Sequence, residues 1–321
     1  MNDIWKTTIG DAFSQYCKSR ENLRYTVTSV TSHNPRVNDM LMPPLSVLSD
    51  DLLGYIVEHV AELSNDDKQL QYLSLADRAF TYHCQKYLFR TLRLQGSNNM
   101  IIDKLKKIGK ILTDNRQLAD KVRVVRLSLN PRNMWLLNSE LINIFQLFVK
   151  SPRPPHELGL DGIQSFAVKI EDPILLVKRL TRSFFSQTLT SLSLSECRNV
   201  PVSIFLICPQ LRIVKLDHVA ATKQSYDHYP KELCFGRESP ALENFNYRDS
   251  HSLIKEMITP PPRFRAPVVL WSSLRVLTLS PHEKKEMVYL QPILNTACNT
   301  LEELFLTNMC VDACKFAFLS E

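Results

Sequence analysis

The chain has 321 residues, 44% of them hydrophobic, and a net charge of +6 at pH 7. This length allows two domains or one extended domain, and the hydrophobic content is that of a folding protein rather than a disordered one. The charge permits acidic partners without requiring them. No run of 18 residues is wholly apolar, and residues 1–6 lack the basic start of a secretory signal, so we expect no membrane span and no membrane partner.

Glycine is scarce, with seven residues in the whole chain. Loops that cradle phosphate groups need glycines where the backbone approaches the ligand. The sequence has no Gly-x-Gly-x-x-Gly, Gly-Lys-Ser/Thr, His-Glu-x-x-His or Gly-x-Ser-x-Gly motif. Gly159 and Gly162 form only a Gly-x-x-Gly pair, which we interpret as a turn. We therefore predict that the protein is not an enzyme, and we assign no catalytic residues and no cofactor.

The eight cysteines lack the Cys-x-x-Cys spacing that is typical of zinc sites. They are Cys17, Cys84, Cys197, Cys208, Cys234, Cys298, Cys310 and Cys314. Cys310 and Cys314 are four residues apart and would share a helix face, but a metal site needs two more ligands nearby. We predict no metal site. We interpret the cysteines as buried free thiols in a reducing compartment, the cytoplasm or the nucleus.

Residues 1–40 are polar and weakly patterned, and they are followed by Pro43 and Pro44. The composition predicts a flexible N-terminal arm that ends in a linker. Residues 41–95 are predicted to form a helical module. Ser49 is placed to cap its first helix, and the acidic residues of the first turn suit the helix dipole. The apolar residues at helical spacing are Leu52, Leu53, Ile56, Val57 and Val60.

A second helix and a third apolar cluster complete the predicted module. Ser64 and Asp67 have the spacing of a capping box at the start of the second helix. Its apolar side contains Leu70, Leu73 and Ala76, and the third cluster contains Phe80, Tyr87, Leu88 and Phe89. About fifty residues bury only a marginal core, so the module needs support from the rest of the chain or from a partner.

Two interpretations of the module remain at this point. It is either the first helical layer of a larger domain or a docking module for an adaptor protein. The order of its pieces favours the second interpretation. Leu-Ser-Asp-Asp-Leu-Leu (48–53) and Leu-Ser-Leu-Ala-Asp-Arg (73–78) are followed by Leu-Phe-Arg-Thr-Leu-Arg-Leu (88–94), which leads into a strand. This order resembles an F-box of the kind common in large fungal protein families.

The resemblance implies that the module binds a Skp-type adaptor and, through it, a cullin-based (SCF-type) E3 ubiquitin ligase. The rest of the chain then holds a protein substrate. The residues that match the adaptor contacts of the motif are Leu48, Leu52, Leu53, Ile56, Leu75, Ala76 and Phe80. Ser49 and Asp77 depart from the family pattern, which usually has proline and a small residue there. These departures support an alternative, an interaction scaffold whose F-box-like module no longer binds the adaptor.

A unit of the form apolar-x-x-apolar-x-apolar recurs after the module. It is found at residues 122–129, 189–194, 211–216, 242–247, 274–279 and 301–306. The last five units start at separations of 22, 31, 32 and 27 residues, and the first is set apart by 67, which leaves room for one or two degraded units. The pattern resembles an irregular leucine-rich repeat array over residues 96–321. The alternating end of each unit predicts a strand with one buried face.

Helices are predicted between these strands. Residues 136–150 and 283–297 carry apolar residues at helical spacing, with a kink expected at Pro292. Asp172 and Pro173 form a cap and first-turn pair for another helix. The expected fold class is therefore α+β, a three-helix F-box-like module followed by a curved α/β leucine-rich-repeat-like solenoid.

The repeat array departs from a regular horseshoe in two respects. Its ninth position favours Asn or Cys, but only Cys197 fits, and the other units have Val219, Ser250, His282 and Met309. The asparagine ladder is therefore missing. The sequence also stops at residue 321 without the polar cap that an open solenoid core needs. Either the C-terminus is truncated or the last helix closes the end unaided.

Three segments have both a functional and a structural interpretation. Lys104, Lys106, Lys107 and Lys110 favour a solvated helix face over nucleic-acid binding, because base-stacking aromatic residues are lacking. The proline-rich residues 260–267 favour a stiff loop over a polyproline II ligand. His218 and His228, with Asp217 and Asp227, lack a recognisable nucleophile for hydrolysis. We favour solvent-facing loops, which makes residues 220–240 and 250–267 candidate substrate contacts.

Overall fold

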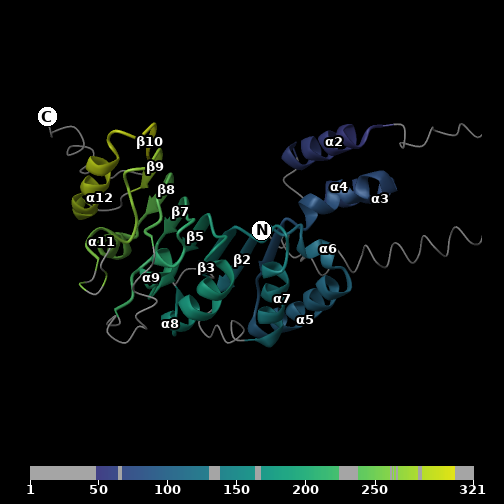
Figure 1. Ribbon diagram of the computed structural model, residues 1–321, viewed down its shortest axis with the longest axis horizontal. Helices are drawn as coiled ribbons and strands as arrows, with labels where there is room; N and C mark the ends of the chain where they lie inside the picture. Colours follow the sequence, from purple (N-terminus) through teal and green to yellow (C-terminus); the bar gives the residue numbers. More distant parts are fainter. Residues whose placement is uncertain are drawn as a thin grey trace, which may run out of the picture.

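The computed structural model describes residues 48–63, 67–129, 138–162, 168–223, 238–260, 262, 264, 267–280 and 284–307. In these residues helices are combined with a parallel sheet. Figure 1 shows three helices set apart at one end and a curved row of strands with helices along its outer side. The predicted arm at residues 1–40, Ser64 of the predicted capping box, and Cys310 and Cys314 lie outside the described residues.

The separate unit consists of α2 (Asp50–Leu63), α3 (Asp67–Ala76) and α4 (Arg78–Leu88). Ser49 begins α2 as predicted, because its Oγ accepts a hydrogen bond from the Leu52 N–H at 3.3 Å. Asp77 begins α4 in the same way and accepts from the Ala79 N–H at 2.8 Å. Each cap satisfies an amide of the first turn that has no partner inside the helix.

The following strands form an eight-stranded sheet whose order is the order of the chain, β1-β2-β3-β5-β7-β8-β9-β10, and all its pairings are parallel. Their bounds are Thr91–Leu94, Val124–Leu129, Glu157–Gly162, Ser191–Ser195, Ile213–Asp217, Asn244–Arg248, Val276–Ser280 and Glu303–Leu306. A parallel pair of β4 (Val168–Lys169) and β6 (Cys197–Arg198) stands beside it. Parallel neighbours need a crossover after each strand. Helices are described in each of these crossovers except that between β7 and β8, where residues 224–237 lie outside the described residues.

The crossover helices lie along one side of the sheet (Figure 1). They are α5 (Asn98–Asp114), α6 (Arg116–Ala119), α7 (Ser139–Val149), α8 (Pro173–Leu175), the π-helix η3 (Leu176–Phe185), α9 (Ser203–Leu206), α11 (His251–Ile258) and α12 (Lys284–Ala297). The predicted helices at residues 136–150 and 283–297 are confirmed, and Pro292 lies inside α12. Asp172 caps α8 as predicted and accepts from the Leu175 N–H.

Two inward rows of side chains explain why the strands stack in register. One row contains Leu92, Val125, Leu158, Leu192, Val214, Phe245 and Leu277, and the other contains Leu94, Leu127, Leu160, Leu194, Leu216, Tyr247 and Leu279. All of them are buried in one hydrophobic core with residues of the crossover helices. Each buried leucine contributes about 1.5–3 kcal/mol, so a one-residue slip of any strand would be costly.

The three-helix unit has a core of its own. Leu53, Val57, Leu70, Phe80 and Cys84 form this second cluster, and none of them belongs to the core of the sheet. The unit is joined to the sheet through the chain between α4 and β1, where Phe89 packs against the main core. The helices of the unit therefore do not form a first layer over the sheet.

The six strands predicted from the repeated unit are all present, as β2, β5, β7, β8, β9 and β10. The gap of 67 residues contains one more strand of the eight-stranded sheet, β3, so the prediction of a turn at Gly159 and Gly162 is wrong. Leu158 and Leu160 point into the core on either side of Gly159, which is the alternation of a strand. β1 pairs with β2, so residues 91–94 belong to the sheet and not to the helical module predicted over 41–95.

The predicted loop at residues 250–267 is also corrected. Its first half is helix α11, which buries Leu253, Ile254 and Met257. Farther along, Phe264 is buried in the main core, which agrees with a structural rather than a ligand role for this proline-rich segment. The other candidate loop, residues 220–240, is described only at residues 220–223 and 238–240.

Other hydrogen bonds take over part of the role of the missing asparagine ladder. Ser250 Oγ accepts from the Val219 N–H at 2.9 Å, and Ser252 Oγ accepts from the Ala221 N–H at 3.0 Å. Both bonds join the start of α11, directly after β8, to the turn after β7. The stacking of neighbouring turns is thus stabilised by hydroxyl groups where a regular repeat would use amide side chains.

Candidate functional site

The residues that the F-box resemblance assigns to adaptor binding fall into two groups in the structure. Leu53 and Phe80 are buried in the core of the three-helix unit. Leu52, Leu75 and Ala76 are exposed, and Leu48 and Ile56 are partly exposed while packing against that core. Only these exposed and partly exposed residues can contact a partner without rearrangement of the unit. Leu53 and Phe80 act instead by holding the helices in place.

Helix α2 is apolar on two faces. Leu53 and Val57 point inward, as one face of an amphipathic helix should. On the outer face, Leu52 is 44% exposed, Tyr55 is 66% exposed and Leu63 is 71% exposed. Positions 52, 55 and 63 are separated by three, eight and eleven residues, and each of these spacings brings side chains to the same side of a helix. The outer face, which also carries exposed acidic residues, therefore presents apolar side chains whose position the folding of the unit alone does not explain.

The outer face of α2 also holds a stacked ring pair. The rings of Tyr55 and His59 are nearly parallel, with an angle of 4° between their planes and 6.3 Å between their centroids. Stacking restricts both side chains before any partner arrives, so less conformational entropy is lost on binding.

Helix α3 contributes a second exposed apolar group. Tyr72 is strongly exposed and Leu75 is 41% exposed, and they lie three residues apart on one side of the helix. On its other side Leu70 and Ser74 are buried. Tyr55, Leu63 and Tyr72 were not among the predicted contacts. The signal that would have found them is helical spacing counted from Leu52 and Leu75, rather than the motif positions alone.

Polar contacts set the geometry of the unit. Asp50 Oδ1 lies 2.9 Å from His83 Nε2 and joins the start of α2 to α4. The Lys121 ammonium lies 3.7 Å from the ring centroid of Tyr82 and joins α4 to the segment before β2. Hydrogen bonding to Lys121 and the charge of Lys121 lower the pKa of Tyr82. These two contacts fix the orientation of α4 without covering the outer face of α2.

The basic segment behaves as a helix face, as expected. In α5, Lys106, Lys107 and Lys110 are exposed, whereas Leu105 and Ile108 are buried against the main core.

The predicted burial of thiols is confirmed for Cys84, Cys197 and Cys208, but Cys298 is exposed. It follows α12, where the helix gives way to a turn.

A second polar cluster lies where strands of the sheet end. Glu196, His218 and Asp249 each follow a strand (β5, β7 and β8) and each has a positive φ. His218 Nδ1 lies 2.7 Å from Asp217 Oδ1, and its Nε2 lies 3.7 Å from Asp249 Oδ2. His218 and Asp217 are thus in contact with each other, while Asp227 and His228 lie outside the described residues.

Comparisons with protein-family models, curated proteins and solved structures give no match for this chain. Among the helices of the described residues, none combines the length and the apolar character needed to cross a bilayer. Interpretation of function therefore rests on the geometry of the three-helix unit and of the sheet.

Proposed function

We propose that the chain is a non-enzymatic substrate-recognition subunit of a cullin-based (SCF-type) E3 ubiquitin ligase. The three-helix unit is an F-box-like module that docks on a Skp-type adaptor. The strand and helix units after it form a leucine-rich-repeat-like solenoid that holds a protein substrate. The protein contributes position and effective concentration to ubiquitin transfer and makes or breaks no bond.

The observation that carries the proposal is the outer face of α2. Leu52, Tyr55 and Leu63 are exposed on a unit that stands apart from the main core. Exposed apolar side chains that gather on one face mark sites of protein interaction, and aromatic residues are enriched in such sites. Leu52 is one of the residues that match the F-box motif, and it lies on this face. Leu75, which also matches the motif, is exposed on α3.

The arrangement of the sheet supports the substrate-holding part of the proposal. Parallel strands in chain order, with helices along one side, leave the other side of the sheet without helices (Figure 1). The side chains that point away from the core include Arg93, Arg126, Lys215 and Arg248, which are exposed. Such a surface binds extended partners in repeat proteins.

Ser49 and Asp77 depart from the F-box pattern, and on sequence alone they favoured a scaffold that no longer binds the adaptor. The structure gives both residues another role. Each accepts a hydrogen bond from a first-turn amide, so each has a structural role inside the unit. A module that only capped the array would be expected to share the core of the array. Its separate core supports docking to another protein.

Binding of a Skp-type adaptor by a surface variant tests the proposal. The double variant Leu52→Asp with Leu75→Asp places charges on the exposed contacts and leaves Leu53 and Phe80 in the core. We expect adaptor affinity to fall at least about thirtyfold, since anchor residues each contribute about 2 kcal/mol or more. Val288→Asp, on the exposed side of α12, is the matched control and should bind normally. Equal binding by the double variant and the control would contradict the proposal.

The proposed compartment is the cytoplasm or the nucleus. Cys84, Cys197 and Cys208 are buried free thiols, which suits a reducing environment.

A further inference from the structure

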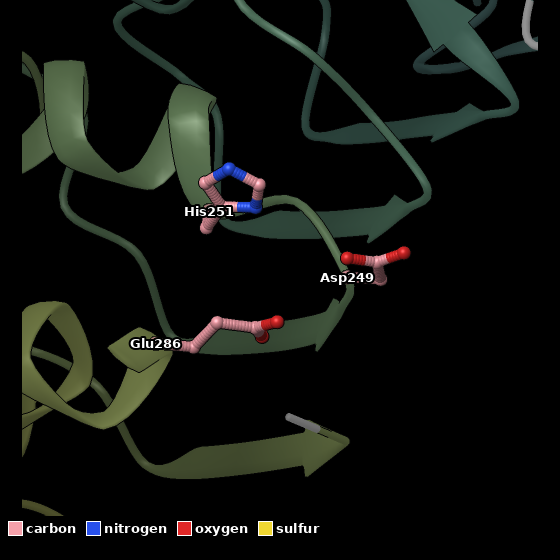
Figure 2. A group of neighbouring side chains, drawn as sticks. All are labelled: Asp249, His251 and Glu286. Carbon is pink, nitrogen blue, oxygen red and sulfur yellow. The ribbon is translucent and has the colours of Figure 1, made fainter. Parts of the chain in front are cut away.

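We propose that Asp249, His251 and Glu286 form a binding site for a divalent transition-metal ion. Figure 2 shows the three side chains converging from the turn after β8, the first residue of α11 and the first turn of α12. Their ligand atoms, two carboxylate oxygens and one imidazole nitrogen, all lie within 4.8 Å of one another. A metal ion lies about 2.0–2.2 Å from its nitrogen and oxygen ligands. One ion would therefore bind all three groups after small rotations of the side chains, two of which are exposed or partly exposed.

The burial of Glu286 distinguishes this group from an ordinary acidic surface. Its side chain is 1% exposed, yet its carboxylate faces Asp249, a second carboxylate. Two carboxylates this close repel each other, and the burial of Glu286 reduces the screening of this repulsion by solvent. A cation held between them would turn this repulsion into attraction.

An outer hydrogen bond orients Glu286. Tyr247 Oη donates to Glu286 Oε2, and Tyr247 is itself buried. A carboxylate held by a hydrogen-bond donor that does not bind the ion is the usual arrangement around protein metal sites.

The donor set indicates the kind of ion. Imidazole nitrogen together with carboxylate oxygen suits Zn²⁺, Mn²⁺ or Fe²⁺, whereas Ca²⁺ prefers a shell of six to eight oxygens. His251 is exposed and Asp249 is partly exposed, so the remaining coordination positions face solvent. Water would fill them.

The ion would act as a clamp between successive units of the sheet. Asp249 and His251 follow β8, whereas Glu286 follows β9, the next strand. Coordination would tie the start of α11 to the start of α12, and ligands that bind only the folded state stabilise it. This inference is independent of the proposed ligase role, because the three residues lie far along the array from α2–α4 (Figure 1).

Equilibrium dialysis of the chelator-treated full chain against Zn²⁺ tests the site, with thermal unfolding as a second readout. We expect one ion that the native chain binds saturably and that raises the unfolding temperature. His251→Ala removes an exposed ligand without disturbing the core, and it should weaken this binding at least about tenfold. His59→Ala changes an exposed histidine on α2 and is the matched control.

Two further variants sharpen the test. Tyr247→Phe keeps the ring in the core and removes only the bond to Glu286, so it should weaken binding about tenfold or more. Glu286→Gln should abolish binding if it folds. The site would be disproved if no chain bound Zn²⁺ saturably, or if His251→Ala bound as tightly as His59→Ala. Either result would leave the adaptor proposal untouched.

Discussion

At the scale of single residues, Asp77 shows how a departure from a motif can have a structural cause. Its carboxylate accepts the Ala79 N–H and begins α4. We expect Asp77→Ala to destabilise the three-helix unit by about 1 kcal/mol, because an amide of the first turn loses its partner. Asp77→Asn keeps the acceptor and should unfold like the native protein. Hydrogen exchange of α4 amides measures both, and equal exchange in the two variants would contradict this role.

The buried thiols give a second prediction at this scale. Burial raises the pKa of Cys84 to about 11 and of Cys197 and Cys208 to about 12, so few thiolates are present at neutral pH. Cys298 is exposed. We expect iodoacetamide to modify Cys298 at least about a hundredfold faster than the buried thiols at pH 7.5. Mass spectrometry of the peptides resolves the sites, and rapid labelling of Cys197 in the folded chain would contradict the structure.

At the scale of elements, strand β3 depends on the absence of a side chain at one position. A Cβ at Gly162 would lie 2.2 Å from the carbonyl oxygen of Glu196. That oxygen cannot move freely, because it accepts the Val168 N–H at 2.7 Å. We expect Gly162→Ala to lower the free energy of unfolding by about 1–3 kcal/mol.

Gly159→Ala is the matched control within the same strand. The three atoms nearest to its Cβ would belong to the side chain of Arg126, the closest at 3.2 Å, so no backbone atom approaches as closely as at Gly162. Urea unfolding of both variants measures the difference. A loss at Gly159→Ala as large as that at Gly162→Ala would show that the close backbone approach is not what requires glycine.

Several elements were predictable from sequence because their periodicity is strong. The leucines of 189–194 and 274–279 alternate as a half-buried strand must, and β5 and β9 follow. β3 was not predicted, because Gly159 and Gly162 interrupt the alternation of apolar and polar residues and resemble a turn. α11 escaped because eight residues give too little helical periodicity to outweigh the prolines that follow.

The candidate sites were predictable only in part. α2 is apolar on two faces, so spacing alone does not separate the inward Leu53 from the outward Leu52. Asp249 and His251 are near neighbours in sequence, but Glu286 joins them only through the pairing of β8 with β9. A contact of this kind depends on sheet register, which no local pattern in the chain reveals.

At the scale of the whole molecule, the main feature is the separation of two hydrophobic cores. The core of α2–α4 is small, and a unit of this size is marginal alone. Its exposed face would be covered, and the unit stabilised, when a partner binds. The larger core is formed without residues of α2–α4, so under the proposed function the sheet would hold the substrate while α2–α4 bind the adaptor. Such a division of tasks suits a recruitment protein.

Hydrogen–deuterium exchange of the full chain, with and without a purified Skp-type adaptor, tests the central claim most directly. The proposed docking predicts slower exchange at amides of α2 and α3 when the adaptor is present, with strands β5–β9 unchanged. Protection should saturate at one adaptor per chain. Unchanged exchange in α2 and α3 at saturating adaptor, or protection confined to the sheet, would contradict the account.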